Sequence, residues 1–195
     1  MDRLIDLVGP KKDSFGKTEY LIILLHGWGS NGNDLIQLAN YWHQELPSAT
    51  FLAPNAPEIC NANPEGKQWF DIMTNDKLKM YKELEKAYNL LLKYLHKQLK
   101  SYKLEKNKFF LVGFSQGTML ALHTALKEKC LGVIGYSGAL LKNDPSEAKI
   151  KNKILLIHGK KDNIVPLNRM ESAYKNLQEL SFDVQKLVFE NLEHS

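Results

Sequence analysis

Residues 109–129 read FFLVGFSQGTMLALHTALKEK, and this stretch decides the fold. The apolar run at 109–113 predicts a buried strand, and the periodicity of 118–129 predicts a helix. Between them lies the pattern G-x-S-x-G, a turn that holds a serine Oγ exposed at a strand end while its glycines avoid a clash with the following helix. The helix N-terminus supplies N–H groups and partial positive charge beside the same oxygen. The pattern therefore predicts Ser115 as a nucleophile.

Strands and helices alternate along the rest of the chain. We expect strands at residues 4–8, 20–26, 50–53, 109–113, 132–136, 154–158 and 183–189, and helices at 33–46, 77–102, 118–129 and 167–180. This alternation predicts right-handed crossovers and a mostly parallel sheet with helices on both faces. Residues 58–76 are expected to form a long loop, a feature that is usually functional or disordered. We expect residues 1–195 to form a single α/β domain, since no linker or internal repeat interrupts them.

Composition excludes several classes of protein. With 44% hydrophobic and 25% charged residues, the chain of 195 residues is neither disordered nor collagen-like. Its longest apolar run, residues 20–25, is far shorter than the ~18 residues of a membrane span. No secretory signal pattern follows Met1. Cys60 and Cys130 form no CxxC motif, so we expect buried free thiols and a cytoplasmic location.

The formal net charge of +4 comes almost entirely from lysine. Of 26 basic residues, only Arg3 and Arg169 are arginine, the residue type that reads bases and phosphates through a bidentate fork. Several lysines share one face of the expected helix 77–102, opposite a row of leucines and tyrosines. We interpret this face as the solvated side of a core-packing helix, the alternative being a weak docking face for nucleic acid or an anionic membrane. We expect no nucleic-acid partner and at most weak contact with a membrane surface.

A serine nucleophile needs a base, and the base needs an orienting acid. In hydrolases with this order of strands and helices, the chain order is serine, acid, histidine. His194 is the only histidine after His158, and it follows the last expected strand at the edge where open α/β sheets bind ligands. The sequence therefore predicts His194 as the base. His26 and His158, which each precede a glycine at a strand end, are expected to anchor loops.

Asp162 is the expected acid because it follows the strand at 154–158 and so leaves the same edge of the sheet as Ser115. Two other carboxylates compete for this role. Asp183 lies on an expected strand between apolar neighbours, and Asp144 precedes Pro145 in a turn that we interpret as structural.

The loop HGWGSNG at residues 26–32 is expected to supply a second N–H donor, because its glycines let the backbone bend toward an oxyanion. A phosphate-binding loop is the alternative interpretation. The loop lacks the G-x-x-x-x-G-K-[ST] pattern, and its G-x-G-x-x-G spacing lacks an acidic residue after a second strand, since Glu45 lies within an expected helix. The sequence also has no H-E-x-x-H or CxxC motif, so we expect no cofactor and no metal.

Several separate motifs resemble the phospholipase/carboxylesterase family of α/β-hydrolases, which includes the acyl-protein thioesterases. The matching segments are LHGWG at 25–29, APNAP at 53–57, WFD at 69–71, GFSQG at 113–117, YSG at 136–138, and HG at 158–159 with Asp162, Val165 and Pro166. The resemblance implies an α/β-hydrolase fold without a large cap domain. It also implies an enzyme that cleaves carboxylic esters or thioesters of acyl groups.

The resemblance further implies the roles of single residues in the site. It assigns Ser115, Asp162 and His194 as the catalytic triad, the backbone N–H groups of Trp28 and Gln116 as the oxyanion hole, and Trp69 and Phe70 as the border of the acyl groove. Apolar residues near this site predict a groove that favours longer acyl chains over acetyl.

Two features depart from the family. Trp28 stands where a smaller aliphatic residue is expected, which bears on the width of the groove. One residue, Ser195, follows His194, whereas the family continues into a final helix. We therefore expect that helix to be missing, and His194 to be mobile or displaced in a weak catalyst, because termini fray unless they are tied down.

The sequence thus predicts a cytoplasmic serine carboxylesterase or thioesterase that works through an acyl-enzyme. Its expected substrates are small esters or thioesters, lysophospholipids or acylated proteins, and neither acyl length nor oligomeric state has a signature in the sequence. One alternative is a catalytically weak or inactive binding protein on a hydrolase fold. Another is a serine peptidase of the same fold.

Overall fold

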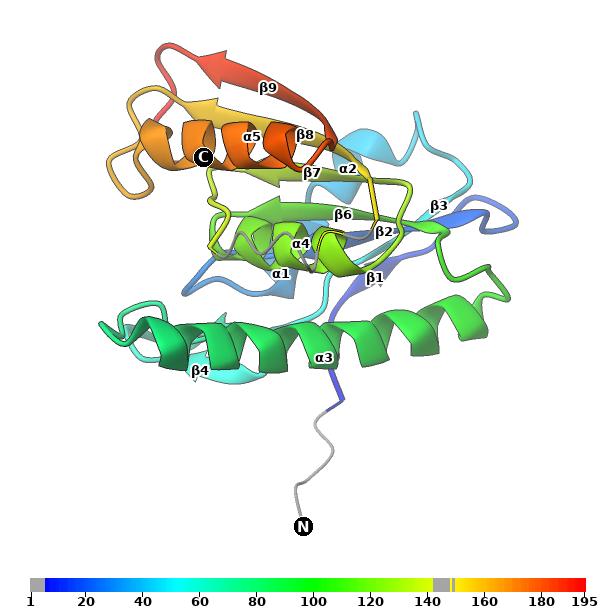
Figure 1. Ribbon diagram of the computed structural model, residues 1–195. Coiled ribbons are helices and arrows are strands. Elements are labelled where there is room, and N and C mark those ends of the chain that lie inside the picture. Colours follow the sequence, from blue (N-terminus) through cyan, green and yellow to red (C-terminus); the bar gives the residue numbers. More distant parts are fainter. Residues whose placement is uncertain (1–5, 142–147, 149) are drawn as a thin grey trace.

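The computed structural model describes residues 6–141, 148 and 150–195, and within these residues seven strands form one sheet (Figure 1). The strands, in sheet order, are β1 (Lys11–Lys12), β3 (Ala49–Leu52), β2 (Tyr20–Leu25), β6 (Phe109–Phe114), β7 (Gly132–Tyr136), β8 (Lys153–Gly159) and β9 (Asp183–Phe189). Only the β1–β3 pair is antiparallel among them. The expected mostly parallel sheet is confirmed.

Helices cover both faces of this sheet (Figure 1). Those of the described residues are α1 (Gly32–Ile36), α2 (Ala39–Trp42), α3 (Lys77–Ser101), α4 (Gln116–Lys127) and α5 (Leu167–Glu179). From β2 the chain continues to β3 on one side of it in the sheet, whereas β6, β7, β8 and β9 follow one another toward the other side. Because crossovers between parallel strands are right-handed, α1 and α2 lie on one face of the sheet and the longer helices on the other.

Strand β2 is buried on both faces, as its continuous apolar sequence predicts. Leu21 and Ile23 pack into the larger hydrophobic cluster, which α3, α4 and α5 cover. Ile22 and Leu24 pack into a smaller cluster with Phe51 beneath α1 and α2. Two cores therefore hold the centre of the sheet rigid from both sides.

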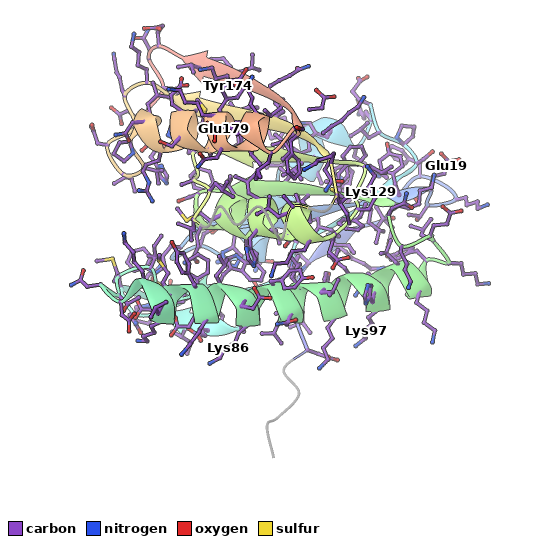
Figure 2. All side chains as sticks on the ribbon, in the orientation of Figure 1. Glu19, Lys86, Lys97, Lys129, Tyr174 and Glu179 are labelled. Carbon is purple, nitrogen blue, oxygen red and sulfur yellow. The ribbon has the colours of Figure 1, made fainter. Side chains whose placement is uncertain are left out.

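Helix α3 begins at Lys77 because the Asp76 carboxylate accepts hydrogen bonds from the backbone N–H groups of Leu78 and Lys79. Its lysines lie on the outer side: Lys86 and Lys97 are exposed and point away from the sheet (Figure 2). The predicted solvated face of this helix is confirmed. Among the described helices, none is long and apolar enough to cross a membrane. Cys60 and Cys130 are both buried free thiols.

Three expected elements differ from the structure. The helix at 33–46 is two short helices joined by i→i+3 backbone bonds, from Leu38 N–H to the Leu35 carbonyl among others, so the run is overwound between them. The strand at 4–8 is absent where the structure describes it, at residues 6–8, while residues 4 and 5 lie outside the described residues. The edge strand is instead β1.

The third difference is a hairpin within the expected loop 58–76. Strands β4 (Glu58–Cys60) and β5 (Asn63–Gln68) pair antiparallel. This hairpin has little local signature, because β5 is mostly polar and the turn at residues 61–62 lacks the glycine typical of two-residue hairpins. As shown below, the hairpin is held by a neighbouring loop rather than by a core of its own.

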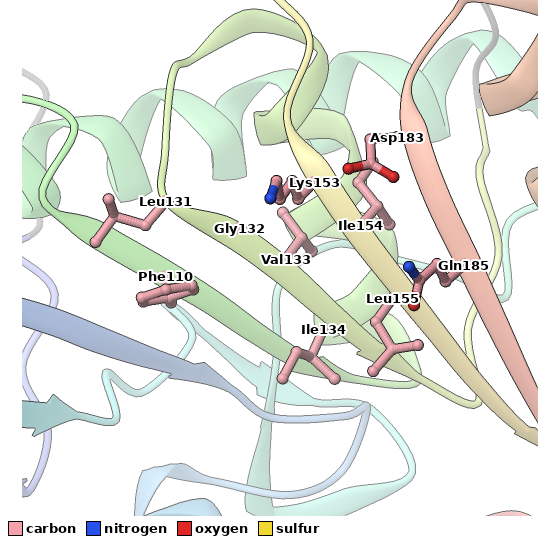
Figure 3. Close-up of a pocket in the computed structure, with 10 residues that line it drawn as sticks. All are labelled: Phe110, Leu131, Gly132, Val133, Ile134, Lys153, Ile154, Leu155, Asp183 and Gln185. Carbon is pink, nitrogen blue, oxygen red and sulfur yellow. The ribbon is translucent and has the colours of Figure 1, made fainter. Parts of the chain in front are cut away.

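One hollow of about 320 Å³ lies against the sheet, at the starting ends of three strands (Figure 3). Gly132, Lys153 and Asp183, the first residues of β7, β8 and β9, are among its lining residues. Parallel α/β sheets bind their ligands at the opposite, carboxyl ends of the strands. A functional site is therefore expected at the carboxyl ends of the strands.

Candidate active site

Ser115 lies in a tight turn between β6 and α4 and has a φ of +53° with a ψ of −112°. Non-glycine residues in such sparsely populated regions typically cost about 1–3 kcal/mol, and they cluster at functional sites. The Ser115 N–H donates to the carbonyl of Tyr136, the last residue of β7, at 2.9 Å, which ties the turn to the neighbouring strand. Gly117 is required because a Cβ there would lie 1.9 Å from the Leu25 carbonyl oxygen. Ser115 itself is 8% exposed. The strand, the strained turn and the helix that the sequence predicts at this position are all present.

Asp162 follows β8 at the same edge of the sheet, and its side chain is fully buried. Its Oδ1 accepts hydrogen bonds from the backbone N–H groups of Ile164 (2.9 Å) and Val165 (2.8 Å). Its Oδ2 lies 2.8 Å from His194 Nδ1. Burial raises the pKa of this carboxyl, but the hydrogen bonds from His194, Val165 and Ile164 outweigh it and leave the pKa below its usual value. The acid is thus held ionised and aimed at His194.

His194 lies between this acid and the elbow. Because Nδ1 donates to the Asp162 carboxylate, Nε2 is the nitrogen left to act as a base. The ring also packs against Phe114, the residue before Ser115, with 5.0 Å between ring centroids. Within the described residues no hydrogen bond joins Ser115 Oγ to His194, as is common in structures without substrate. The three predicted residues are brought to one edge, with the acid–base pair already formed.

The expected displacement of His194 is not found. The hydroxyl of Ser137, a residue with a φ of +47°, donates to the carbonyl oxygen of Ser195 at 2.6 Å and so holds the residue after His194. On the preceding side, the Lys161 N–H donates to the Leu192 carbonyl at 3.0 Å. The expectation overlooked these contacts because they join segments that are far apart in the sequence.

The backbone N–H groups of Trp28 and Gln116 donate no hydrogen bond to other groups of the described chain, so both are available to an oxyanion. The loop that carries Trp28 is fixed by the β4–β5 hairpin. Gly29 N–H donates to the Lys67 carbonyl at 2.9 Å, and the Trp28 indole N–H donates to Gln68 Oε1 at 3.0 Å. Sequence reasoning missed Gln68, whose role depends on a hairpin that it did not predict.

Trp69 and Phe70, which the resemblance places at the border of the acyl groove, are 2% and 0% exposed. Both side chains pack in the larger hydrophobic cluster, and the side-chain amide of Gln116 binds their backbone. It accepts from the Trp69 N–H at 2.9 Å and donates to the Phe70 carbonyl at 2.8 Å. The Trp69 indole N–H in turn donates to the His26 carbonyl at 3.0 Å. Residues 69–70 are therefore hydrogen-bonded both to the elbow, through Gln116, and to the loop at 26–32, through His26.

The remaining candidates lie elsewhere or have structural partners. Asp183 is the first residue of β9, at the opposite end of the sheet from Asp162, and Asp144 lies outside the described residues. His26 anchors its loop as expected, since its Nδ1 lies 2.8 Å from the Gly27 carbonyl oxygen and its Nε2 accepts from a backbone N–H. No group of three or more potential ligand side chains in the described part of the chain is arranged to hold a metal ion.

Comparison with known proteins gives a consistent result. The sequence model of the phospholipase/carboxylesterase family matches residues 12–195. Acyl-protein thioesterase 1 of Gibberella zeae is 27% identical, with 99% of this chain and 89% of its own length aligned. Acyl-protein thioesterase 1 of Saccharomyces cerevisiae is 31% identical, over 89% of this chain and 85% of its own. The crystal structure of the esterase PE8 matches with a TM-score of 0.92 at 34% identity, covering 98% of this chain and 92% of that chain.

Proposed function

The chain belongs to the phospholipase/carboxylesterase family and has its α/β-hydrolase fold, and from this premise we propose that it is a serine hydrolase that cleaves carboxylic esters or thioesters of acyl groups. The observation that carries the proposal is the strained Ser115 beside an acid–base pair, the half-buried His194 and the buried Asp162, joined at 2.8 Å. The relatives named as thioesterases and esterases support the same class of reaction.

In the proposed first step, Ser115 Oγ attacks the acyl carbonyl carbon while His194 Nε2 takes the hydroxyl proton. Asp162 holds the imidazole ring and stabilises the imidazolium that forms. The backbone N–H groups of Trp28 and Gln116 donate to the developing oxyanion, and the loss of one such donor typically costs about 10²–10³ in rate.

In the second step, the tetrahedral intermediate collapses, and His194 gives its proton to the leaving alcohol or thiol. Water then attacks the acyl-enzyme with His194 again as the base, and the carboxylic acid leaves with Ser115 restored. These steps balance with water as the only co-reactant, so the proposal includes no metal and no cofactor.

The proposed substrates are small esters or thioesters, lysophospholipids or S-acylated proteins, and nucleic acid is not a proposed partner. A cytoplasmic location and a single hydrolase domain over residues 1–195 belong to the same proposal. Trp28 is half-buried and Met73 is 71% exposed, and these are the apolar residues that we propose contact the acyl chain.

A hydrolysis panel tests this function. Acetyl, butyryl and octanoyl esters of one chromogenic alcohol, and the matching thioesters, are offered to the wild-type protein and to Ser115→Ala. We expect hydrolysis by the wild type, with kcat lower by about 10⁴–10⁶ in the variant. An inactive wild-type protein would support a binding protein instead, and faster cleavage of the matching amides would support a peptidase. A variant that keeps about 1% of activity or more would overturn the assignment of Ser115.

A further inference from the structure

A second histidine faces the proposed catalytic acid. His158 is the residue before the last in β8, and it is 0% exposed. Its Nε2 lies 2.7 Å from the Val165 carbonyl oxygen and 3.3 Å from Asp162 Oδ2. Because a carbonyl oxygen can only accept, the proton of the ring must be on Nε2. The ring therefore directs one N–H at both the turn and the acid.

Both backbone groups of Val165, at the end of the turn 162–165, are held by hydrogen bonds. The Val165 N–H donates to Asp162 Oδ1, and the Val165 carbonyl accepts from His158. The same Asp162 Oδ2 that receives the His194 hydrogen bond also faces the His158 N–H. In the described structure, Asp162 is the titratable group that faces the His158 ring. His194 binds the same carboxylate and is linked to His158 only through it.

The other ring nitrogen of His158, Nδ1, is buried and has no hydrogen-bonding partner in the part of the chain that the structure describes. All polar contacts of the ring in the described structure consequently go to the turn and its carboxylate. A histidine that served only to fill the core would gain nothing over an apolar side chain, because leaving a buried polar atom unpaired is unfavourable.

We propose that His158 is a positioning residue, which fixes the Asp162 carboxylate so that Oδ2 stays aligned with His194 Nδ1 during the reaction. The proposal rests on the hydrolase function proposed above and goes beyond it, because it assigns His158 a part in catalysis in addition to anchoring a loop. As His194 gains the Ser115 proton, the carboxylate is already oriented toward the new imidazolium. No reorganisation of the acid is then needed in the transition state.

His43 provides a matched control. It is also a buried histidine, 7% exposed, and its Nε2 lies 2.8 Å from a backbone carbonyl oxygen, that of Asp13. Its ring contacts are Phe15 and Phe51, which are not part of the proposed site. Removing either imidazole therefore takes away a comparable buried hydrogen bond, but only His158 touches the acid.

The test compares His158→Leu, His158→Gln and His43→Leu with the wild type for kcat and KM on one ester, together with the thermal midpoint. We expect kcat of His158→Leu to fall roughly 10- to 100-fold with KM unchanged, since a misplaced catalytic group costs rate rather than binding. His158→Gln places an amide N–H where Nε2 was and should restore most of this loss. His43→Leu should lower the thermal midpoint and leave kcat as in the wild type.

If His158→Leu fails to fold, His158→Asn replaces it, because its shorter amide cannot reach the Nε2 position. A folded Leu or Asn variant with wild-type kcat overturns the proposal, as does a Gln variant that is no better than either. When the wild type is active and Ser115→Ala is not, these outcomes reject the role of His158 alone. A wild type that hydrolyses no ester rejects the proposed function, and this role with it.

Discussion

The two side chains proposed to react, Ser115 and His194, come from regions that are built differently. The elbow (residues 113–117) joins α4 to β6, a central strand of the sheet whose Leu111 and Val112 pack into the two cores. The base loop (residues 190–195) follows β9, an edge strand whose Leu187 and Phe189 are 49% and 51% exposed. The first region is fixed by packing and the second mainly by hydrogen bonds to residues 137, 161 and 162.

Because the two regions are held in different ways, substitutions in them should affect different properties of the protein. A change in the elbow disturbs the hydrophobic core and should alter the free energy of global unfolding. A change in the base loop disturbs segments at the sheet edge, where local opening costs less than global unfolding. Substitutions in the elbow are therefore expected to lower mainly the free energy of unfolding, and substitutions in the base loop mainly kcat.

The largest effect is expected from Asp162→Asn. The amide keeps the shape of the side chain but favours the wrong tautomer of His194, and a change of this kind lowers kcat by about 10⁴. Steady-state kinetics on one ester measures it. A loss of less than about tenfold would mean that the base loop positions His194 without the acid.

The next largest effect is expected from Gly117→Ala in the elbow. The added Cβ would lie 1.9 Å from the Leu25 carbonyl oxygen, which is backbone of the central strand β2 and cannot move aside. We expect the free energy of unfolding to fall by about 3 kcal/mol, measured by urea denaturation. Unchanged stability would show that the elbow is not fixed by packing.

Gly159→Ala makes the matching change at the base loop. Here the Cβ would lie 2.2 Å from the Leu192 carbonyl oxygen, which belongs to the exposed loop that carries His194. We expect the loop to shift outward, with kcat lower by roughly tenfold or more and a smaller loss of stability than for Gly117→Ala. Equal losses of stability in the two alanine variants would contradict the distinction between the regions.

The smallest effect concerns acid stability. The pKa of Asp162 is lowered in the folded protein, so its charge contributes stability at neutral pH that is lost as the pH falls from the usual value of about 3.9 through the lowered folded value. We expect the stability difference between the wild type and Asp162→Asn to shrink over that range. Urea titrations at several pH values measure it, and a difference that grows toward acid would contradict the sign of the shift.

Parts of the fold and site were predictable because they are encoded locally. The sequence of 113–117 specifies its own turn, since the two glycines allow the close approach of strand and helix that places Ser115 between them. The parallel order of strands followed from their alternation with helices. Asp162 and His194 were found because each follows a strand that ends at the same edge of the sheet.

Other parts depend on contacts between distant segments and could not be read from local sequence. The β4–β5 hairpin is stabilised by hydrogen bonds to residues 29–30, and the backbone N–H of the buried Trp69 donates to Gln116, 47 positions away. Ser137 ties down Ser195 across 58 positions of sequence. In each case the tertiary fold, and not the neighbouring sequence, brings a polar group to its partner.

Covalent labelling tests the central claim, that Ser115 is the nucleophile of an acyl-enzyme. The wild-type protein is treated with an alkyl fluorophosphonate, digested, and mapped by mass spectrometry, with Ser115→Ala as the control. We predict one adduct, on the peptide that contains Ser115, formed in step with the loss of esterase activity and absent from the variant. An adduct on another residue, such as Ser137, or inhibition with Ser115 unmodified, would contradict it.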